Sequence, residues 1–340
     1  MPKQKLAVAE LLSRIPTALF PMALGLAGFG GALRTASAFF GIGWLGNAGV
    51  ALLVAAALVL VVDAVLYLGK LVRAREHVKA DLGDTTSANL IAPAFMATMV
   101  IGSQLSALTP IGLWLWAGAT AGHLLLLLQY VGRWVAVDHD SDDLNPTWFL
   151  PAAGIMTASM TAPSGVPDPP VVFVFATGLT LWLILLPLVV RRTVFEPALA
   201  PRLRPSLFIF AAPFGLAANS LMNIAPGVDP IVPTTLAFGG AFFIFALIAL
   251  PRFIAEAGVT LSWWGTTFPV ATVATALINL AARSGSAFEA GFGLVLLVFA
   301  ALCVAIAIAA TVRVGWSTCL GAFDVAESEI AALRGSMGED

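Results

Sequence analysis

The chain has 340 residues, of which 59% are hydrophobic and 11% are charged, and its formal net charge is −2. Soluble domains usually carry about 25% charged residues, so this composition excludes a soluble globular protein and indicates a polytopic membrane protein. The net charge says little about function, because the charged residues lie mainly in the connections between apolar segments.

Residues that catalyse reactions or bind metals are sparse. The three histidines, His77, His123 and His139, lack the spacing of a metal site, and Cys303 and Cys319 indicate no disulfide framework. The sequence has neither a recognisable catalytic pair nor the basic, aromatic patch that is typical of nucleic-acid binding. We therefore expect no enzyme activity, no metal, no cofactor and no nucleic-acid partner.

Ten apolar segments approach or exceed the length needed to cross a ~30 Å hydrocarbon core as helices that rise ~1.5 Å per residue. The first resembles a secretory signal, but the run of 19 uncharged residues before Arg34 is longer than a signal core, which favours a retained span. The sequence thus predicts an all-α membrane protein with ten transmembrane helices. The segments cover residues 15–34, 44–69, 87–105, 110–132, 146–163, 170–190, 205–224, 231–250, 258–282 and 287–312.

The distribution of Lys and Arg predicts the orientation. If the N-terminus is cytoplasmic, 15 of the 17 basic residues fall on the cytoplasmic side and only Arg34 and Arg283 fall outside. This arrangement gives five helical hairpins, each going out on an odd-numbered helix and returning on an even-numbered one. It divides the chain into a cytoplasmic N-terminus (1–14), a transmembrane domain (15–312) and a cytoplasmic C-terminal tail (313–340), in which residues 324–334 are expected to form a short helix.

Each odd-numbered segment carries a proline within two positions of a phenylalanine. Successive prolines are 56 to 72 residues apart, which indicates one two-helix unit used five times. Proline removes a backbone hydrogen bond, so all five prolines are candidate helix kinks; alternatively, Pro93 and Pro151 simply begin their helices. The pairs are Phe20 with Pro21, Pro93 with Phe95, Phe149 with Pro151, Pro213 with Phe214, and Phe268 with Pro269.

Odd and even segments differ in chemistry. The odd segments contain no formal charge between their flanks and present small residues along one face, whereas the even segments are dense in Leu, Val, Ile and Phe. Helices that are apolar all round suit a lipid-facing layer. We therefore expect an inner ring of five kinked odd helices around an axial pore, enclosed by an outer ring of five even helices.

The segment 258–282 has an unusual face for a membrane helix, because a stripe of small and polar residues runs along it with one large ring. At helical spacing, Gly265, Phe268, Thr272, Thr275 and Asn279 align, and Pro269 follows the ring near the middle of the span. One interpretation is an ordinary helix–helix interface, where small and polar residues are enriched. The other is a pore wall in which Phe268 is the plug.

Two ionisable residues lie inside even segments. Asp63 is ten residues before Arg73 and His123 is ten residues before Arg133, which places both ~15 Å from the cytoplasmic surface. A carboxylate at this depth needs a partner or a water pocket, so we predict a structural hydrogen bond between Asp63 and His123. Proton coupling and contact at a subunit interface are the alternatives.

Two motifs resemble a known family. The run from Trp263 to Pro269 is similar to the ninth helix of the slow anion channels of plants, and the run from Asn145 to Pro151 is similar to the fifth helix of bacterial tellurite-resistance permeases. The resemblance extends over nearly the whole chain. It implies a homotrimer in the plasma (inner) membrane of a bacterium, with ten helices and a separate pore in each protomer, blocked by the ring that matches Phe268.

The sequence and the resemblance together favour a channel for small inorganic or carboxylate anions. Uncharged pore helices provide no tight site, so ions enter and leave quickly. The alternative is a secondary transporter of C4-dicarboxylates such as malate, of sulfite or of tellurium oxyanions, but a coupled carrier needs a titratable pore residue, and the odd helices show none. Arg34 and Arg283 are candidates for an outer pore mouth; alternatively, they anchor their helices at the membrane interface. Phe20, Phe95, Phe149 and Phe214 are secondary candidates for pore lining; alternatively, they pack near the helix starts.

Overall fold

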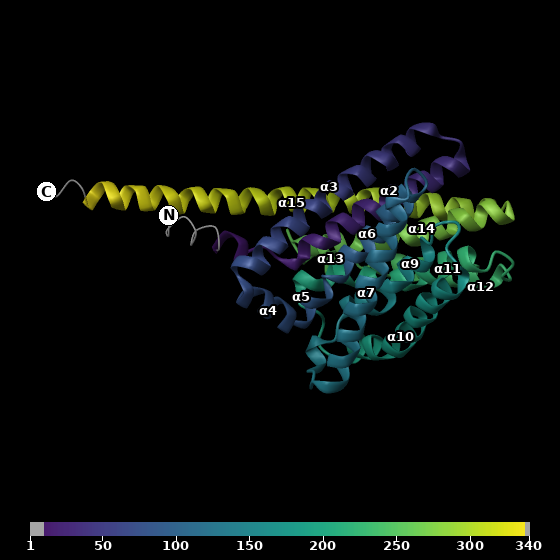
Figure 1. The fold of residues 1–340 in the computed structure, drawn as a ribbon, viewed down its shortest axis with the longest axis horizontal. Coiled ribbons are helices and arrows are strands. Elements are labelled where there is room, and N and C mark those ends of the chain that lie inside the picture. The colour runs from purple at the N-terminus through teal and green to yellow at the C-terminus, as the bar shows by residue number, and fades with distance from the viewer. Residues whose placement is uncertain (1–9, 337–340) are drawn as a thin grey trace.

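The structure is a computed structural model in which residues 10–336 are described, with side chains described as far as residue 315. The described part contains helices and no strands (Figure 1). The prediction of an all-α protein is thus confirmed. One long helix, α15 (Ala287–Ser336), extends well beyond the rest of the bundle. It continues as a single helix through residues 324–334, where the sequence predicted a separate short helix.

Eight helical stretches in the described part are long and apolar enough to cross a membrane. The sequence predicted ten spans, and two of these do not qualify. The helix α2 (Phe20–Phe40) is long enough but carries Arg34 and several glycines, so it is less apolar. The eight are α3 (Gly43–Arg73), α5 (Thr85–Asn89) continued by α6 (Ala92–Ser106), α7 (Ile111–Ala136), α10 (Asp168–Phe195), η5 (Pro201–Ala211) continued by α11 (Ala212–Ile224), α12 (Ile231–Ile248), η6 (Leu261–Trp263) continued by α14 (Trp264–Ser284), and α15 over Ala287–Gly315.

The fifth predicted segment is interrupted, which is why it does not qualify as one long helix. It is made of four short pieces in succession, none longer than five residues. Pro146, Pro151 and Gly154 lie in these pieces, and proline and glycine both weaken a continuous helix. The pieces are η3 (Pro146–Trp148), α8 (Phe149–Ala152), η4 (Ala153–Ile155) and α9 (Met156–Met160).

Helices that follow one another pack as pairs: α2 with α3, α6 with α7, α9 with α10, α11 with α12, and α14 with α15. The odd-numbered segments also touch one another in a closed cycle that runs α2, α6, α9, α11, α14 and back to α2. In the most apolar 18 residues of Pro201–Ile224 and of Leu261–Ser284, 78% of the residues are buried. The corresponding share is 22% for α3 and 28% for α12. The odd segments therefore form the centre of the molecule, and their partners present apolar side chains at its surface.

Glycines allow the paired helices to approach closely. A Cβ on Gly49 of α3 would lie 2.6 Å from the carbonyl oxygen of Gly30 on α2. In the next pair, a Cβ on Gly112 of α7 would lie 2.6 Å from the carbonyl oxygen of Gly102 on α6. No real Cβ tolerates such a distance to backbone, so the close contacts α2–α3 and α6–α7 depend on glycine.

Most of the repeated prolines begin helices rather than bend them. Pro21, Pro93 and Pro213 lie in the first turn of α2, α6 and α11. For Pro213 this corrects the expectation of a mid-helix kink, because the preceding residues form the 3-10 helix η5 and the α-helix begins only at Ala212. Pro151 lies in the interrupted fifth segment. Pro269 alone among the five is inside a long α-helix, α14.

Short helices precede the odd segments, at the end of the bundle where those segments begin. They are η1 (Thr17–Leu19), α4 (Arg75–Gly83), η2 (Ser141–Asp143) and α13 (Pro251–Ala255). We call this end of the bundle the proximal end, and the end where the odd segments finish the distal end.

Candidate functional site: two cavities near Phe268

The proximal cavity has a volume of about 250 Å³ and lies among the first turns of the odd segments. Its wall is a mixture of apolar side chains and hydroxyl groups, with the charges of Asp84 and Arg202 among them. Phe268, Pro269, Gly265, Pro21 and Pro93 are all lining residues. Three of the repeated prolines therefore face a common space at this end of the bundle.

The distal cavity has a volume of about 430 Å³ and lies among the last turns of the odd segments. Its lining residues come from α2, α6, α9, α11 and α14, and Arg283 is the only charged residue among them. The rest of its polar wall consists of hydroxyl and amide groups. These are Thr35, Ser103, Gln104, Thr161, Asn219, Asn223, Thr272, Thr275 and Asn279.

Phe268 lines the proximal cavity and lies against a lining residue of the distal cavity. Its side chain is 3% exposed and lines the proximal cavity. Its ring lies directly against Gly28 of α2, which lines the distal cavity: a Cβ on Gly28 would be 2.5 Å from Cδ2 of Phe268. The absence of a side chain at Gly28 leaves the room that the ring fills between α2 and α14.

The polar stripe predicted on residues 258–282 spans both cavities. Gly265 lines the proximal cavity, and Thr272, Thr275 and Asn279 line the distal cavity. The hydroxyls of Thr272 and Thr275 donate to the backbone oxygens of Pro269 and Ala271, at 2.9 and 2.8 Å. The threonines therefore satisfy their own hydrogens within α14.

The four other phenylalanines of the repeat pack against neighbouring side chains and are not among the residues that line either cavity. The ring of Phe20 meets Tyr67 of α3 edge-on at 5.4 Å, and Phe95 lies against Gly122 of α7. Phe149 meets Phe210 at 5.5 Å, and Phe214 meets Trp182 of α10 at 4.8 Å. The structure thus places Phe268 apart from the other four.

The two arginines of the distal end differ in their surroundings. Arg283 lines the distal cavity and donates from Nη2 to the carbonyl oxygen of Met222 at 2.7 Å. Arg34 is not a lining residue; its Nη1 donates to Oε1 of Gln104 on α6. Gln104 was not singled out in the sequence, because one glutamine near the end of a helix carries no distinctive signal.

The predicted hydrogen bond between Asp63 and His123 does not form. Nε2 of His123 on α7 lies 2.9 Å from the backbone oxygen of Pro151, in the interrupted fifth segment. Because a carbonyl can only accept, Nε2 carries the hydrogen, and Nδ1 of the same ring is buried without a partner. Asp63 on α3 is 4% exposed, and its Oδ2 atom also has no hydrogen-bond partner.

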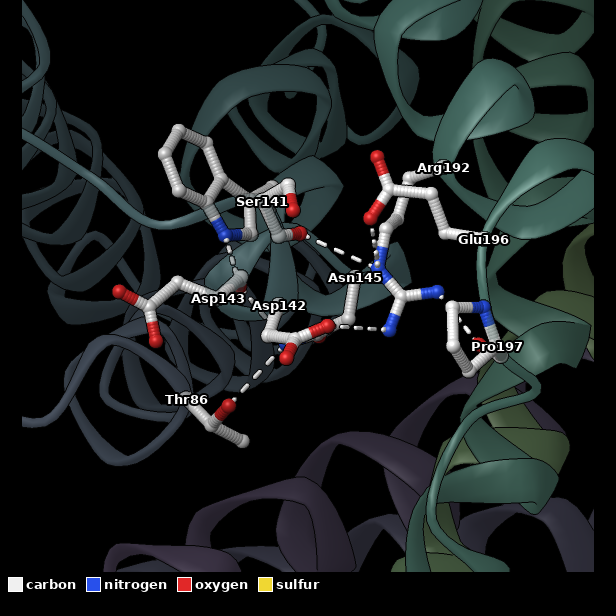
Figure 2. Close-up of polar contacts among 9 residues, drawn as sticks. Thr86, Ser141, Asp142, Asp143, Asn145, Arg192, Glu196 and Pro197 are labelled. Carbon is white, nitrogen blue, oxygen red and sulfur yellow. Dashed lines mark hydrogen bonds and ion pairs between the residues drawn. The ribbon is translucent and has the colours of Figure 1, made fainter.

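A polar network holds the start of the interrupted segment at the proximal rim (Figure 2). The amide of Asn145 donates to Thr86 Oγ1 at 3.1 Å and to the backbone oxygen of Asp143 at 3.0 Å, and its Oδ1 accepts from the backbone N–H of Thr147 at 3.0 Å. Thr86 and Thr147 both line the proximal cavity. The network therefore ties the cavity wall to the loop before the fifth segment.

Arg192, near the end of α10, binds the same loop, and Figure 2 shows its guanidinium pointing toward Asp142. Its guanidinium donates to the backbone oxygens of Ser141 and Pro197, at 3.1 and 2.7 Å, and lies 3.2 Å from Oδ1 of Asp142. Arg192 is buried, which suits a structural role better than contact with a mobile ion. Its role was not visible in the sequence, where it is one of many basic residues on the same side.

Comparison with known proteins supplies the family. Residues 14–312 match the SLAC1 family, described as voltage-dependent anion channel. The chain is 28% identical to the S-type anion channel SLAH2 of Arabidopsis thaliana over 65% of this chain and 43% of the relative. It is 25% identical to a tellurite resistance protein TehA homolog of Haemophilus influenzae over 65% of this chain and 68% of the relative.

A second plant relative, the S-type anion channel SLAH3, is 26% identical over 67% of this chain and 36% of the relative. The chain thus spans less than half the length of the plant relatives that it matches. The resemblance predicted from the motifs at 145–151 and 263–269 is confirmed, because the match includes both. The chain therefore belongs to the SLAC1 family, a family of membrane anion channels and transporters.

Proposed function

We propose that this protein is an anion channel whose conduction path runs along the axis of the odd segments, from the proximal to the distal cavity. The observation that supports it most directly is the position of Phe268, which lines one cavity and touches Gly28 of the other. In this proposal the ring closes the path and must move, or be replaced by a smaller side chain, for ions to pass.

The proposed membrane arrangement has ten helices in five hairpins, with α2 and the interrupted fifth segment also crossing the bilayer. The pairing of successive helices and the closed cycle of odd segments support it. Backbone that departs from a regular helix is tolerated at membrane depth where protein surrounds it, and the interrupted segment is almost entirely buried. Cytoplasmic termini, a homotrimer and the plasma (inner) membrane of a bacterium complete the proposal.

The polarity of the cavities favours a channel over a coupled carrier. The distal cavity has one charged side chain among its lining residues, Arg283, and the polar stripe from Gly265 to Asn279 has none. Neutral donors lower the dehydration cost of a small anion without holding it tightly, which allows rapid passage. The second candidate, a transporter of C4-dicarboxylates, sulfite or tellurium oxyanions, is carried by the similarity to a relative named for tellurite resistance.

Reversal potentials of the purified protein in planar bilayers distinguish the two functions. A channel gives currents that reverse at the equilibrium potential of the permeant anion, and a pH gradient at fixed anion concentrations does not shift the reversal. Chloride, nitrate, sulfite and malate are compared in turn to rank permeability. A reversal potential that follows the pH gradient contradicts the channel and supports the coupled carrier.

A further inference from the structure

The amide groups that line the distal cavity have fixed orientations, beginning with Asn219 of α11. Its Nδ2 atom donates to the backbone oxygens of Gly215 and Thr272, at 2.8 and 3.0 Å, which uses both hydrogens. Its Oδ1 atom accepts from Nδ2 of Asn279 at 3.1 Å. Nδ2 of Asn279 therefore donates one hydrogen to Asn219 and has a second hydrogen available. Asn279 is itself a lining residue of the cavity.

The carboxamide of Gln104 is oriented from the opposite wall. A guanidinium group has five donors and no acceptor, so the atom of Gln104 that faces Arg34 must be its oxygen. The NH₂ group of a planar carboxamide then points elsewhere. Because Gln104 lines the distal cavity and Arg34 does not, we infer that the NH₂ group is turned toward the cavity. The side chain of Gln104 makes no other hydrogen bond among the described residues.

The wall of the distal cavity thus offers donors without a competing negative charge. No Asp or Glu is among its lining residues, all of which are described. Arg283 gives one N–H to Met222 and retains others. Gly31 of α2, a lining residue, leaves space open, since a Cβ there would meet no atom within 4 Å. A site whose N–H groups still have hydrogens to donate, and which has no carboxylate, suits an anion that only accepts hydrogen bonds.

We propose that the distal cavity is an anion-binding station in which Gln104 Nε2, Asn279 Nδ2 and the guanidinium of Arg283 donate to the ion. Arg34 acts as a positioning residue that holds the Gln104 amide with its NH₂ group inward. The ligand is a small monovalent anion without hydrogens to donate, such as chloride or nitrate, since mostly neutral donors compensate poorly for dehydration of a dianion. This inference rests on the proposed function, because it places the station on the same conduction path.

The first test replaces Gln104 by Glu in the full chain with the Phe268→Ala change, reconstituted in bilayers at constant ionic strength. The substitution keeps the shape and exchanges the inward donor for an oxygen. Loss of a hydrogen bond to a charged ligand predicts that the chloride concentration for half-maximal conductance rises about tenfold. Gln129→Glu on the exposed face of α7 adds the same charge away from the cavity and should leave this value unchanged. An unchanged value for Gln104→Glu, or an equal rise for Gln129→Glu, overturns the proposal.

A double-mutant cycle tests the role of Arg34. If Arg34 acts through Gln104, Arg34→Met raises the chloride concentration for half-maximal conductance in the Phe268→Ala protein. The same change should add nothing to the effect of Gln104→Met when both are present. Additive effects overturn the positioning role and leave Arg34 as a separate charge.

Binding without conduction separates this inference from the proposed function. Chloride should raise the thermal unfolding midpoint of the purified protein with Phe268 intact, and Gln104→Glu should abolish the increase. That result supports the station even where Phe268→Ala fails to conduct, which counts against the proposed gate alone. A conducting Phe268→Ala protein with unaltered chloride stabilisation in Gln104→Glu counts against the station alone.

Discussion

The hydrogen bond from His123 to Pro151 is a single contact that supports the interrupted fifth segment from α7. His123→Leu removes the donor and leaves a buried carbonyl without a partner, which should lower the free energy of unfolding by about 1–3 kcal/mol. The thermal unfolding midpoint in detergent measures the effect. His77→Leu, at an exposed position of α4, is the control and should have little effect. Equal midpoints for the two variants contradict the role of His123.

A change at Asp63 should not lower stability as His123→Leu does, because the Oδ2 atom of Asp63 has no hydrogen-bond partner to lose. Asp63→Asn preserves the shape of the side chain and removes the potential for a buried unpaired charge, whose burial is costly. We predict an unfolding midpoint equal to or above that of the wild type, with unchanged anion selectivity. A loss of stability as large as that of His123→Leu is incompatible with an unpartnered Asp63.

Arg283, near the end of α14, is the charged residue among those that line the distal cavity. A positive charge there raises the local anion concentration and acts within a Debye length of ~10 Å at 0.1 M salt and ~3 Å at 1 M. In the Phe268→Ala background, Arg283→Glu should reduce anion flux into the cavity several-fold at low salt and little near 1 M. Arg191→Glu on α10 is the matched control. Equal reduction at both salt concentrations contradicts a long-range effect of this charge.

The burial of these two residues could be predicted from the sequence, but their partners could not. Asp63 and His123 were expected at equal depth inside apolar segments, and both are buried. Each residue of a helix turns its side chain by about 100° from the one before, so depth leaves the direction open. His123 faces the fifth segment, whereas Asp63 lies on α3, which packs against α2 and α6.

At the scale of elements, the contact of α6 with α7 depends on glycine. A Cβ on Gly112 meets the backbone of α6 at Gly102, which cannot move aside as a flexible side chain would. We expect Gly112→Ala to cost about 1–3 kcal/mol through overpacking. Gly118→Ala on the same helix meets open space and should be neutral or stabilising, since alanine favours helix. Equal unfolding midpoints for the two variants, measured in detergent, contradict the close packing of this pair.

The repeat of proline and phenylalanine predicted where the odd segments lie but not the role of each residue. A proline near the start of an apolar run is compatible with a first turn or with a kink, and only the helix boundary decides. The boundary is set by the preceding backbone, which is 3-10 before Pro213 and regular α before Pro269. The interruption of residues 146–160 is likewise supported by a distant donor, His123, that local sequence does not reveal.

The whole molecule separates a buried centre from an apolar surface. The centre contains the odd segments with their glycines, hydroxyls and amides, and the helices around it expose large apolar side chains such as Val54, Leu58 and Leu125. This layering was predicted from composition alone, since uniformly apolar helices suit lipid. The cavities were not, because they arise where the side chains of five separate segments leave space.

In the proposed function, the ring of Phe268 closes a path between the two cavities. The most direct measurement is the anion conductance of purified Phe268→Ala in bilayers beside the wild type and a matched Phe214→Ala control. Phe214 also neighbours a repeat proline, but it packs against Trp182 and lines neither cavity. If Phe268 is the gate, conductance should be well above wild type for Phe268→Ala and equal to wild type for Phe214→Ala. A folded Phe268→Ala protein that conducts no better than wild type, or an equal increase in both variants, contradicts it.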